Sequence, residues 1–86
     1  MNNFLITQIL RHVQDADTGT GVDLNTFQPD LAGTPEEKNQ HIEFCLSLGY
    51  LSGERTELQN GPVYGSMQIT EAGRKRLRMR IWAPKR

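Results

Sequence analysis

Two residues that could bind a metal ion, His41 and Cys45, lie four positions apart in the sequence. On a helix this spacing places both side chains on one face, and zinc accepts imidazole and thiolate ligands. A zinc site needs further donors, but His12 is the only other histidine and Cys45 the only cysteine. We therefore interpret Cys45 as a core cysteine beside a boundary histidine, and we predict no metal site and no cofactor.

The sequence has no pattern typical of an active site. A glycine-rich phosphate loop and a nucleophile motif are both missing. The nearest approach to a catalytic pair is His12 with Asp15 or Asp17, at the end of an expected helix. We expect a protein without catalytic activity.

Charge is divided unevenly along the chain, although the net charge is zero. Residues 1–65 hold three cations and nine carboxylates, a net charge of −6. Residues 66–86 hold seven cations and one carboxylate, a net charge of +6. Such a division predicts a basic helix on an acidic body, attracted either to the body itself, to another subunit, or to a polyanionic partner.

The length of 86 residues is that of one domain, and we expect residues 1–86 to form a single unit. The apolar runs, such as Phe4–Ile6, are far too short to cross a bilayer. The first residues lack the positive and apolar regions of a signal peptide. We expect a cytoplasmic protein that does not enter the membrane.

The first half of the chain predicts two helices. Apolar residues at helical spacing indicate a helix over residues 3–16, namely Ile6, Ile9, Leu10 and Val13. Residues 22–27 fit a short strand and the start of an irregular helix equally well. Thr34, Pro35 and Glu37 form a capping-box pattern for a second helix over residues 35–48, which Gly49 should end in a left-handed conformation.

The second half predicts a β-hairpin and a basic helix. Residues 50–59 and 63–69 should be the arms, turning at Asn60–Gly61. Alternation places Val63, Met67 and Ile69 on one face, and Tyr64, Ser66 and Gln68 on the other. Gly65 lies on the face of Val63, where a close approach of another segment or a bulge can be accommodated. Residues 70–82 should form the last helix, capped by Thr70 and followed by a short tail, 83–86.

This order of elements, α+β with three helices and a two- to three-stranded antiparallel wing, resembles the winged-helix superfamily. The segments Ile42–Leu51 and Ile69–Leu77 resemble the sequences that precede and follow the wing hairpin in MarR-like and PadR-like regulators. In length and order the chain is most similar to small YjcQ-like domains of bacteria and prophages. The resemblance covers about residues 4–82, and it implies a DNA-binding or protein-binding role.

If the DNA-reading role applies, the helix over residues 35–48 would enter the major groove. The resemblance then assigns base or phosphate contacts to Lys38, Asn39, Gln40 and Glu43, with Arg55 on the wing. The helix is poorly suited to phosphates, because Lys38 is its only cation among three glutamates.

The last helix carries the other candidate surface, with Arg74, Lys75 and Arg78 away from the apolar face of Gly73, Leu77 and Ile81. These cations could grip double-stranded DNA in a transcription regulator, or an acidic protein in a phage-type interaction module that docks on host machinery. Trp82 could pack on the first helix or anchor a partner. A homodimer is a further expectation.

Overall fold

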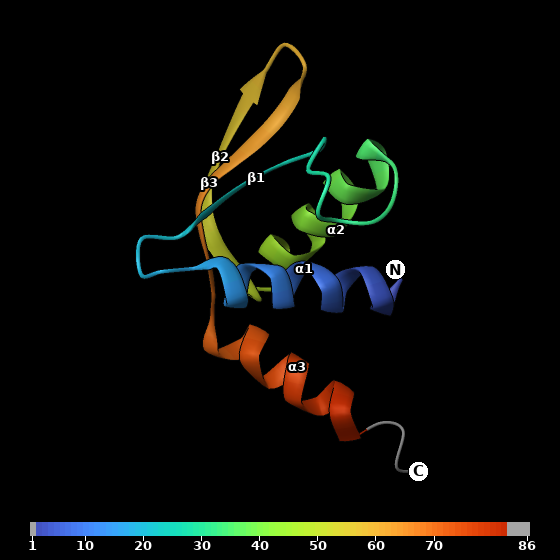
Figure 1. Ribbon diagram of the computed structural model, residues 1–86, viewed down its shortest axis with the longest axis vertical. Helices are drawn as coiled ribbons and strands as arrows, with labels where there is room; N and C mark the ends of the chain where they lie inside the picture. The colour runs from blue at the N-terminus through green and yellow to red at the C-terminus, as the bar shows by residue number, and fades with distance from the viewer. Residues whose placement is uncertain (1, 83–86) are drawn as a thin grey trace.

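The computed structural model describes the backbone of residues 2–82 and the side chains of residues 2–78. Over these residues it is an α+β structure with three helices and a three-stranded antiparallel sheet in the order β1-β3-β2 (Figure 1). The predictions for Trp82, for Ile81 and for the tail 83–86 lie outside the described side chains. In chain order the elements are α1 (Asn3–Ala16), β1 (Val22–Asn25), α2 (Pro35–Ser47), β2 (Leu51–Leu58), β3 (Gly61–Ile69) and α3 (Glu71–Trp82).

Helix α1 spans the predicted residues. The side chain of Asn2 caps it by accepting from the amides of Phe4 and Leu5. The four apolar residues that predicted the helix are at most 2% exposed. Burial of side chains of this size stabilises a fold by about 1.5–3 kcal/mol each, so this face is the centre of the core.

Helix α2 begins and ends as the local sequence predicts, apart from one residue at its end. The amide of Glu37 donates to the Thr34 hydroxyl at 3.1 Å, and the Thr34 amide donates to the Glu37 carboxylate at 2.8 Å. The capping box is therefore confirmed. Gly49 has a φ of 76°, and the amide of Tyr50 donates to the Cys45 carbonyl at 2.9 Å, which is the bond of a Schellman motif.

The hairpin is confirmed, but its turn lies one residue earlier than predicted. Gln59 and Asn60 form the turn, and Gly61 already pairs with Leu58 as the first residue of β3. Gly61 has a φ of 121°, whereas Asn60 is not among the residues with positive φ. The glycine thus supplies its conformational freedom after the turn, as in hairpins where an ordinary turn is followed by a left-handed residue.

Residues 22–25 form a strand, which settles the alternative left open by the sequence. Strand β3 contains a bulge directly after Gly65, the residue at which the sequence left room for one. The register between β2 and β3 shifts between Ser52 and Glu54, opposite Ser66, whose φ is 53°. The bulge reverses which face the residues before it occupy. Tyr64 is fully buried on the core side together with Met67, so the prediction that Tyr64 points away from the core was wrong.

Helix α3 begins on the end of β3. The hydroxyl of Thr70 accepts from the Gly73 amide at 3.1 Å, and the Thr70 amide donates to the Tyr50 carbonyl at 3.0 Å. A Cβ atom on Gly73 would lie 2.3 Å from that same carbonyl oxygen, so only glycine allows the helix to approach this closely.

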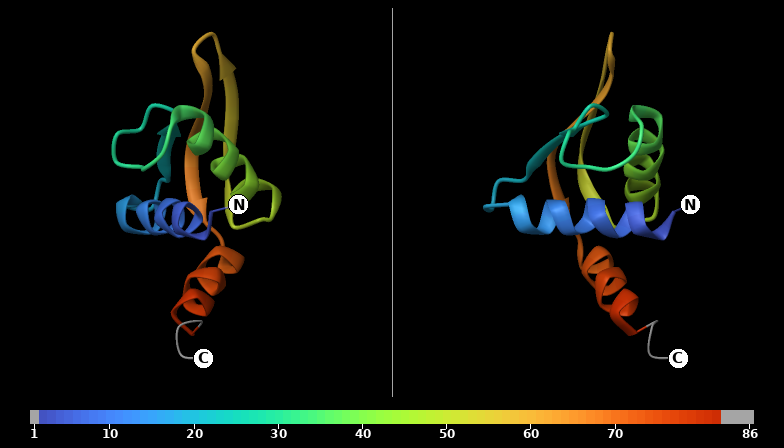
Figure 2. Two further views of the ribbon diagram at one scale, coloured as in Figure 1. Left: turned by 90° about the vertical axis from the view of Figure 1, so that its right-hand side faces the viewer. Right: turned by 45° about the vertical axis from the view of Figure 1, so that its right-hand side comes forward.

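The helices divide between two regions of the molecule. Helices α1 and α2 lie on the core side of the sheet, and α3 lies beyond α1, at the opposite end from the hairpin tip (Figures 1 and 2). Among the described residues no helix combines the length and the apolar character needed to cross a bilayer.

Candidate interaction surfaces

The polar face of α2 is joined to the hairpin through the buried hydroxyl of Tyr64. This hydroxyl lies 2.6 Å from Oδ1 of Asn39 and 2.8 Å from Oε2 of Glu43. One hydroxyl hydrogen serves one acceptor, so both contacts are satisfied when the Asn39 amide is turned to donate to the phenol oxygen. Two residues to which the resemblance assigned base contacts thus hold the sheet against α2.

Arg55 extends this network on β2. Its Nε bonds to the Glu43 carboxylate, and its Nη2 donates to Glu57 at 2.7 Å. These bonds raise the pKa of Arg55 further above its ordinary value, while burial, followed by the bond to Glu43, raises the pKa of Tyr64. Arg55 is the only cation of the three-stranded sheet, which we call the wing, and its pairing with two carboxylates leaves it little positive charge to offer a phosphate.

Lys38 and Gln40 lie in opposite environments. Lys38 is 8% exposed, and its ammonium group donates to the carbonyl of Gln28 in the loop between β1 and α2. The same loop buries Leu31 and donates the Ala32 amide to Gln8 on α1 at 2.8 Å. Lys38 thus fixes this loop, and of the four α2 candidates Gln40 is the one whose side chain is exposed.

His41 and Cys45 are both buried on α2, as residues of the core and its boundary. The two ring nitrogens of His41 are occupied by backbone: Nδ1 lies 2.7 Å from the Glu37 carbonyl, and Nε2 accepts from the Asn2 amide at 3.1 Å. Burial raises the pKa of the Cys45 thiol to about 12. Neither side chain presents a donor to a metal ion in this arrangement, and the described residues contain no cluster of three or more potential ligands.

The described part of α3 presents a basic surface. Arg74, Lys75 and Arg78 are exposed, while Gly73 and Leu77 are buried on the other side of the helix. Arg76 is half-buried and donates to Asn3 of α1 at 2.9 Å. The three exposed side chains, which we call the α3 cation face, thus lie where the sequence placed them.

The α3 cation face is separated from α2 and the wing. Helix α3 lies beyond α1 at one end of the 45 Å long axis, and the hairpin tip lies at the other (Figure 1). The ion pairs formed by described residues join Arg55 to Glu43 and Glu57, and neither involves α3. The expectation that the basic helix pairs with the acidic body of its own chain has no support among these residues.

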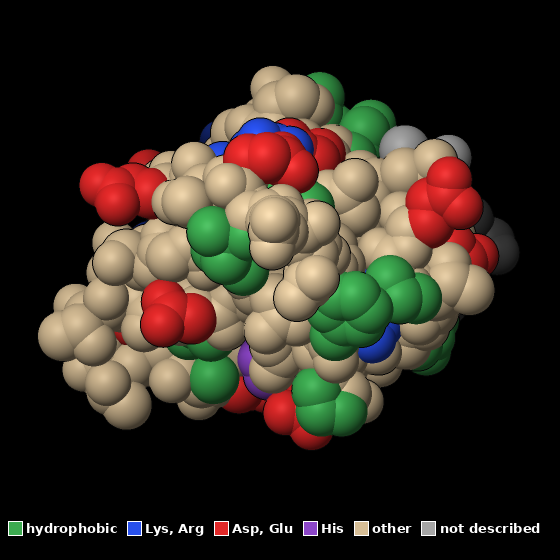
Figure 3. Space-filling view, turned by 90° about the horizontal axis from the view of Figure 1, so that it is seen from above, with side chains coloured by type: hydrophobic (Ala, Val, Ile, Leu, Met, Phe, Trp, Pro, Cys, Tyr) green, Lys and Arg blue, Asp and Glu red, His purple; other side chains and the backbone are tan. Residues whose placement is uncertain are grey.

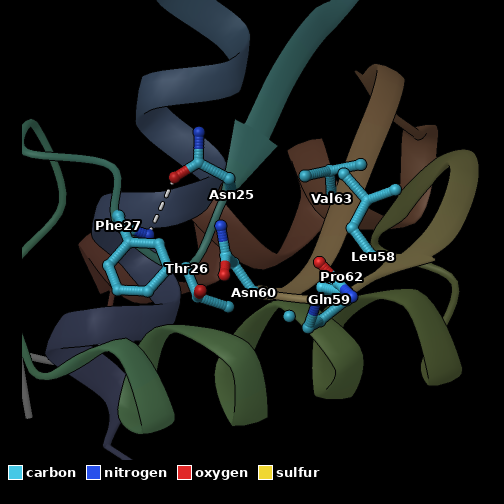
Figure 4. Close-up of a pocket in the computed structure, with 9 residues that line it drawn as sticks. Asn25, Thr26, Phe27, Leu58, Gln59, Asn60, Pro62 and Val63 are labelled. Atoms are coloured by element: carbon cyan, nitrogen blue, oxygen red, sulfur yellow. Dashed lines mark hydrogen bonds between the residues drawn. The ribbon is translucent and has the colours of Figure 1, made fainter.

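A further surface lies at the wing and was not predicted from the sequence. A hollow of about 680 Å³ lies between the end of β1 and the hairpin tip, and it is lined by apolar atoms of Phe27, Leu58, Pro62 and Val63 (Figure 4). Phe27 and Leu58 are 61% and 52% exposed. Exposed apolar side chains that gather around a hollow are typical of binding surfaces.

The hollow continues along the sheet face that is turned away from α2. Thr56, Val63 and Asn25 lie opposite one another in the register, as do Glu54 and Gly65, so they share this outer face. A second hollow of about 290 Å³ shares Asn25 and Val63 with the first and adds Asp23 and Glu54. We call this surface the wing groove; its residues are Asp23, Asn25, Phe27, Glu54, Thr56, Leu58, Gly61, Val63 and Gly65.

The view onto the wing end shows separate hydrophobic groups and several acidic ones among other side chains, with basic groups visible only in small patches (Figure 3). The sequence contains one signal for the groove, the alternation of Gly61, Val63 and Gly65. It leaves the outer face of the central strand with few side chains. The signal is weak because the walls come from two other strands.

Comparisons with protein-family models, with curated proteins and with solved structures returned no match to this chain.

Proposed function

We propose that this chain is a non-catalytic protein of winged-helix type that binds an acidic protein partner through the α3 cation face. The observation that carries the proposal is the exposure of Arg74, Lys75 and Arg78 on a helix remote from the acidic α2 and wing. Three adjacent cations without a described carboxylate partner attract an anionic surface. The winged-helix assignment is supported by the order of the elements and by the antiparallel hairpin between α2 and α3.

The surface of α2 argues against base reading in the major groove. Asn39 and Glu43 are bonded to Tyr64, Lys38 is buried, and Glu36 and Glu37 occupy the first turn. A carboxylate beside a phosphate is repelled, and phosphate attraction supplies most non-specific affinity for DNA. In addition, β1 and a long loop separate α1 from α2, whereas a helix-turn-helix joins its two helices by a turn of about three to four residues.

Double-stranded DNA is the second candidate, because the same three cations would bind phosphates. A DNA complex made by α3 alone would neutralise about three phosphates. The logarithm of its binding constant would then fall linearly with the logarithm of the salt concentration, with a slope of about −2.7. Affinity of that kind does not depend on base sequence.

The test compares wild type with two variants of the α3 cation face. Arg74→Gln/Lys75→Gln/Arg78→Gln removes the charge, and Arg74→Lys/Arg78→Lys keeps the charge and serves as the matched control. These side chains are exposed, so each change should leave the denaturation midpoint nearly unaltered. Each protein is immobilised and exposed to a nuclease-treated cell extract, and each is also titrated with a random-sequence duplex at low and moderate salt.

We expect wild type and the lysine variant to retain the same protein from the extract and the glutamine variant to lose it. Duplex binding should be negligible at about 0.15 M salt. Saturable duplex binding at this salt concentration, if it shows the slope given above and is lost in the glutamine variant, would identify DNA instead of an acidic protein as the partner. Equal retention by the glutamine variant would remove α3 from the binding surface altogether.

A further inference from the structure

The wing groove has an apolar end and an acidic end. Phe27, Leu58 and Val63 line the apolar end near the hairpin tip, and Asp23 and Glu54 lie at the other end of the same sheet face. Both carboxylates are on exposed residues. Exposed apolar groups favour a partner that removes them from water, and the carboxylates favour a partner with cations beside its apolar residues.

The glycines of the central strand leave the floor of the groove open. A Cβ atom on Gly65 would meet only the Asp23 carboxylate, at 3.7 Å, so the space above the central strand is open. Three strands span a width of about 10 Å, which is also about the diameter of a helix. The outer face of the wing can therefore seat one helix of a partner.

We propose that the occupant is α3 of a second copy of this chain, so that copies associate head to tail. The inference rests on the proposed function of the α3 cation face and identifies the acidic surface that it meets. Residues 1–65, which include the groove, carry a net charge of −6, and residues 66–86, which include α3, carry a net charge of +6. The body of one copy therefore attracts α3 of another, and Asp23 and Glu54 place two of the carboxylates in the groove. In the sequence of α3, the apolar Trp82 follows Arg78 by one helical turn.

The contact must be made between two chains. Helix α3 is fixed at its start by Thr70 and Gly73 against Tyr50, and it lies at the opposite end of the molecule from the groove. Its 12 residues span about 18 Å, and the 9 residues of β3 span about 30 Å, so the helix fits within the length of the wing. Because the two contacting surfaces differ, each added copy leaves one groove and one helix open for the next.

Analytical ultracentrifugation over a wide range of protein concentration tests this association at low ionic strength. The groove variant is Asp23→Asn/Glu54→Lys, in which Asn keeps the acceptor that bonds to the Ser66 amide. The helix variant is Arg74→Glu/Lys75→Glu/Arg78→Glu. The matched control, Asp15→Asn/Glu36→Lys, changes the net charge as much as the groove variant does, but at exposed residues of α1 and α2. Leu58→Ser probes the apolar end without changing charge.

We expect the mass of wild type and of the control to rise with concentration and to fall when salt is added. The groove and helix variants should each stay monomeric, and an equimolar mixture of the two should form a 1:1 complex, because the intact groove of one meets the intact helix of the other. Leu58→Ser should weaken association at least about fivefold, as for the loss of about 1 kcal/mol.

Two results would overturn the inference. A wild type that stays monomeric at every concentration would leave the groove without this occupant, although retention of an acidic protein from the extract would still support the proposed function. Association that survives in the groove variant would assign the contact to another surface. Denaturation midpoints of all variants establish that each is folded under the conditions of the assay.

Discussion

Replacing Gly73 by alanine should destabilise the protein, although alanine is the better helix former. The substitution gains about 1 kcal/mol of helix propensity. The added methyl group would lie 2.3 Å from the Tyr50 carbonyl oxygen and 2.7 Å from Cγ1 of Ile69. The carbonyl belongs to the backbone and already accepts from the Thr70 amide, so it cannot move aside without loss of that bond.

The two opposing effects allow the magnitude to be worked out. Inserting a methyl group into a packed site costs about 1–3 kcal/mol, and an immovable backbone contact belongs at the upper end of this range. After the gain in helix propensity, the free energy of unfolding should fall by about 1–2 kcal/mol. For a domain of this size the melting temperature should then fall by about 5–15 °C.

Thermal and urea denaturation followed by circular dichroism measure this change. Gly65→Ala is the matched control, because its new Cβ atom would have an ordinary contact of 3.7 Å with Asp23. Its unfolding free energy should change by less than about 0.5 kcal/mol. A Gly73→Ala protein as stable as wild type, or more stable, would show that α3 does not pack against Tyr50 as described.

Three further predictions concern α2 and its contacts. Thr34→Ala should lower the unfolding free energy by about 0.5–2 kcal/mol in urea denaturation, because half of the capping box is lost. Thr18→Ala is the control, and a Thr34→Ala midpoint equal to that of wild type would show that Thr34 does not stabilise the start of α2. Tyr64→Phe should lower the unfolding free energy by about 0.5–1.5 kcal/mol in the same assay, because the hydroxyl contacts to Asn39 and Glu43 are lost. Tyr50→Phe, which lies outside this network, should lower it less, and equal effects of the two changes would argue against the bonds of Tyr64 to α2. Burial raises the pKa of the Cys45 thiol to about 12. At neutral pH this thiol should therefore react with a thiol reagent more than about a hundredfold more slowly in the native protein than in urea, and rapid reaction without denaturant would contradict its burial.

The position of Tyr64 has consequences for function beyond the core. Because its hydroxyl binds Asn39 and Glu43, two of the residues with suitable chemistry for base contacts are held in an internal network. A DNA-reading role for α2 would require these bonds to break in the complex, at the cost of leaving a buried phenol without a partner. The cations of α3 require no such rearrangement.

The sequence alone determined the features that depend on neighbouring residues. The spacing of Ile6, Ile9, Leu10 and Val13 placed α1, and Thr34 with Glu37 placed the start of α2. The exposed cations of α3 followed from the same helical periodicity. These features are local because helix periodicity and capping act within one or two turns of the chain.

Only the tertiary structure decided which side of the sheet the hairpin residues face and which polar residues are in contact. The bulge at Ser66 depends on the close approach of Gly21, since a Cβ atom there would lie 2.6 Å from the Ser66 backbone. That contact joins segments far apart in the sequence, and the bulge turns Tyr64 toward α2. The wing groove and the separation of α3 from the acidic end arise for the same reason, because strands and helices distant in the sequence must pack together before their side chains share a surface.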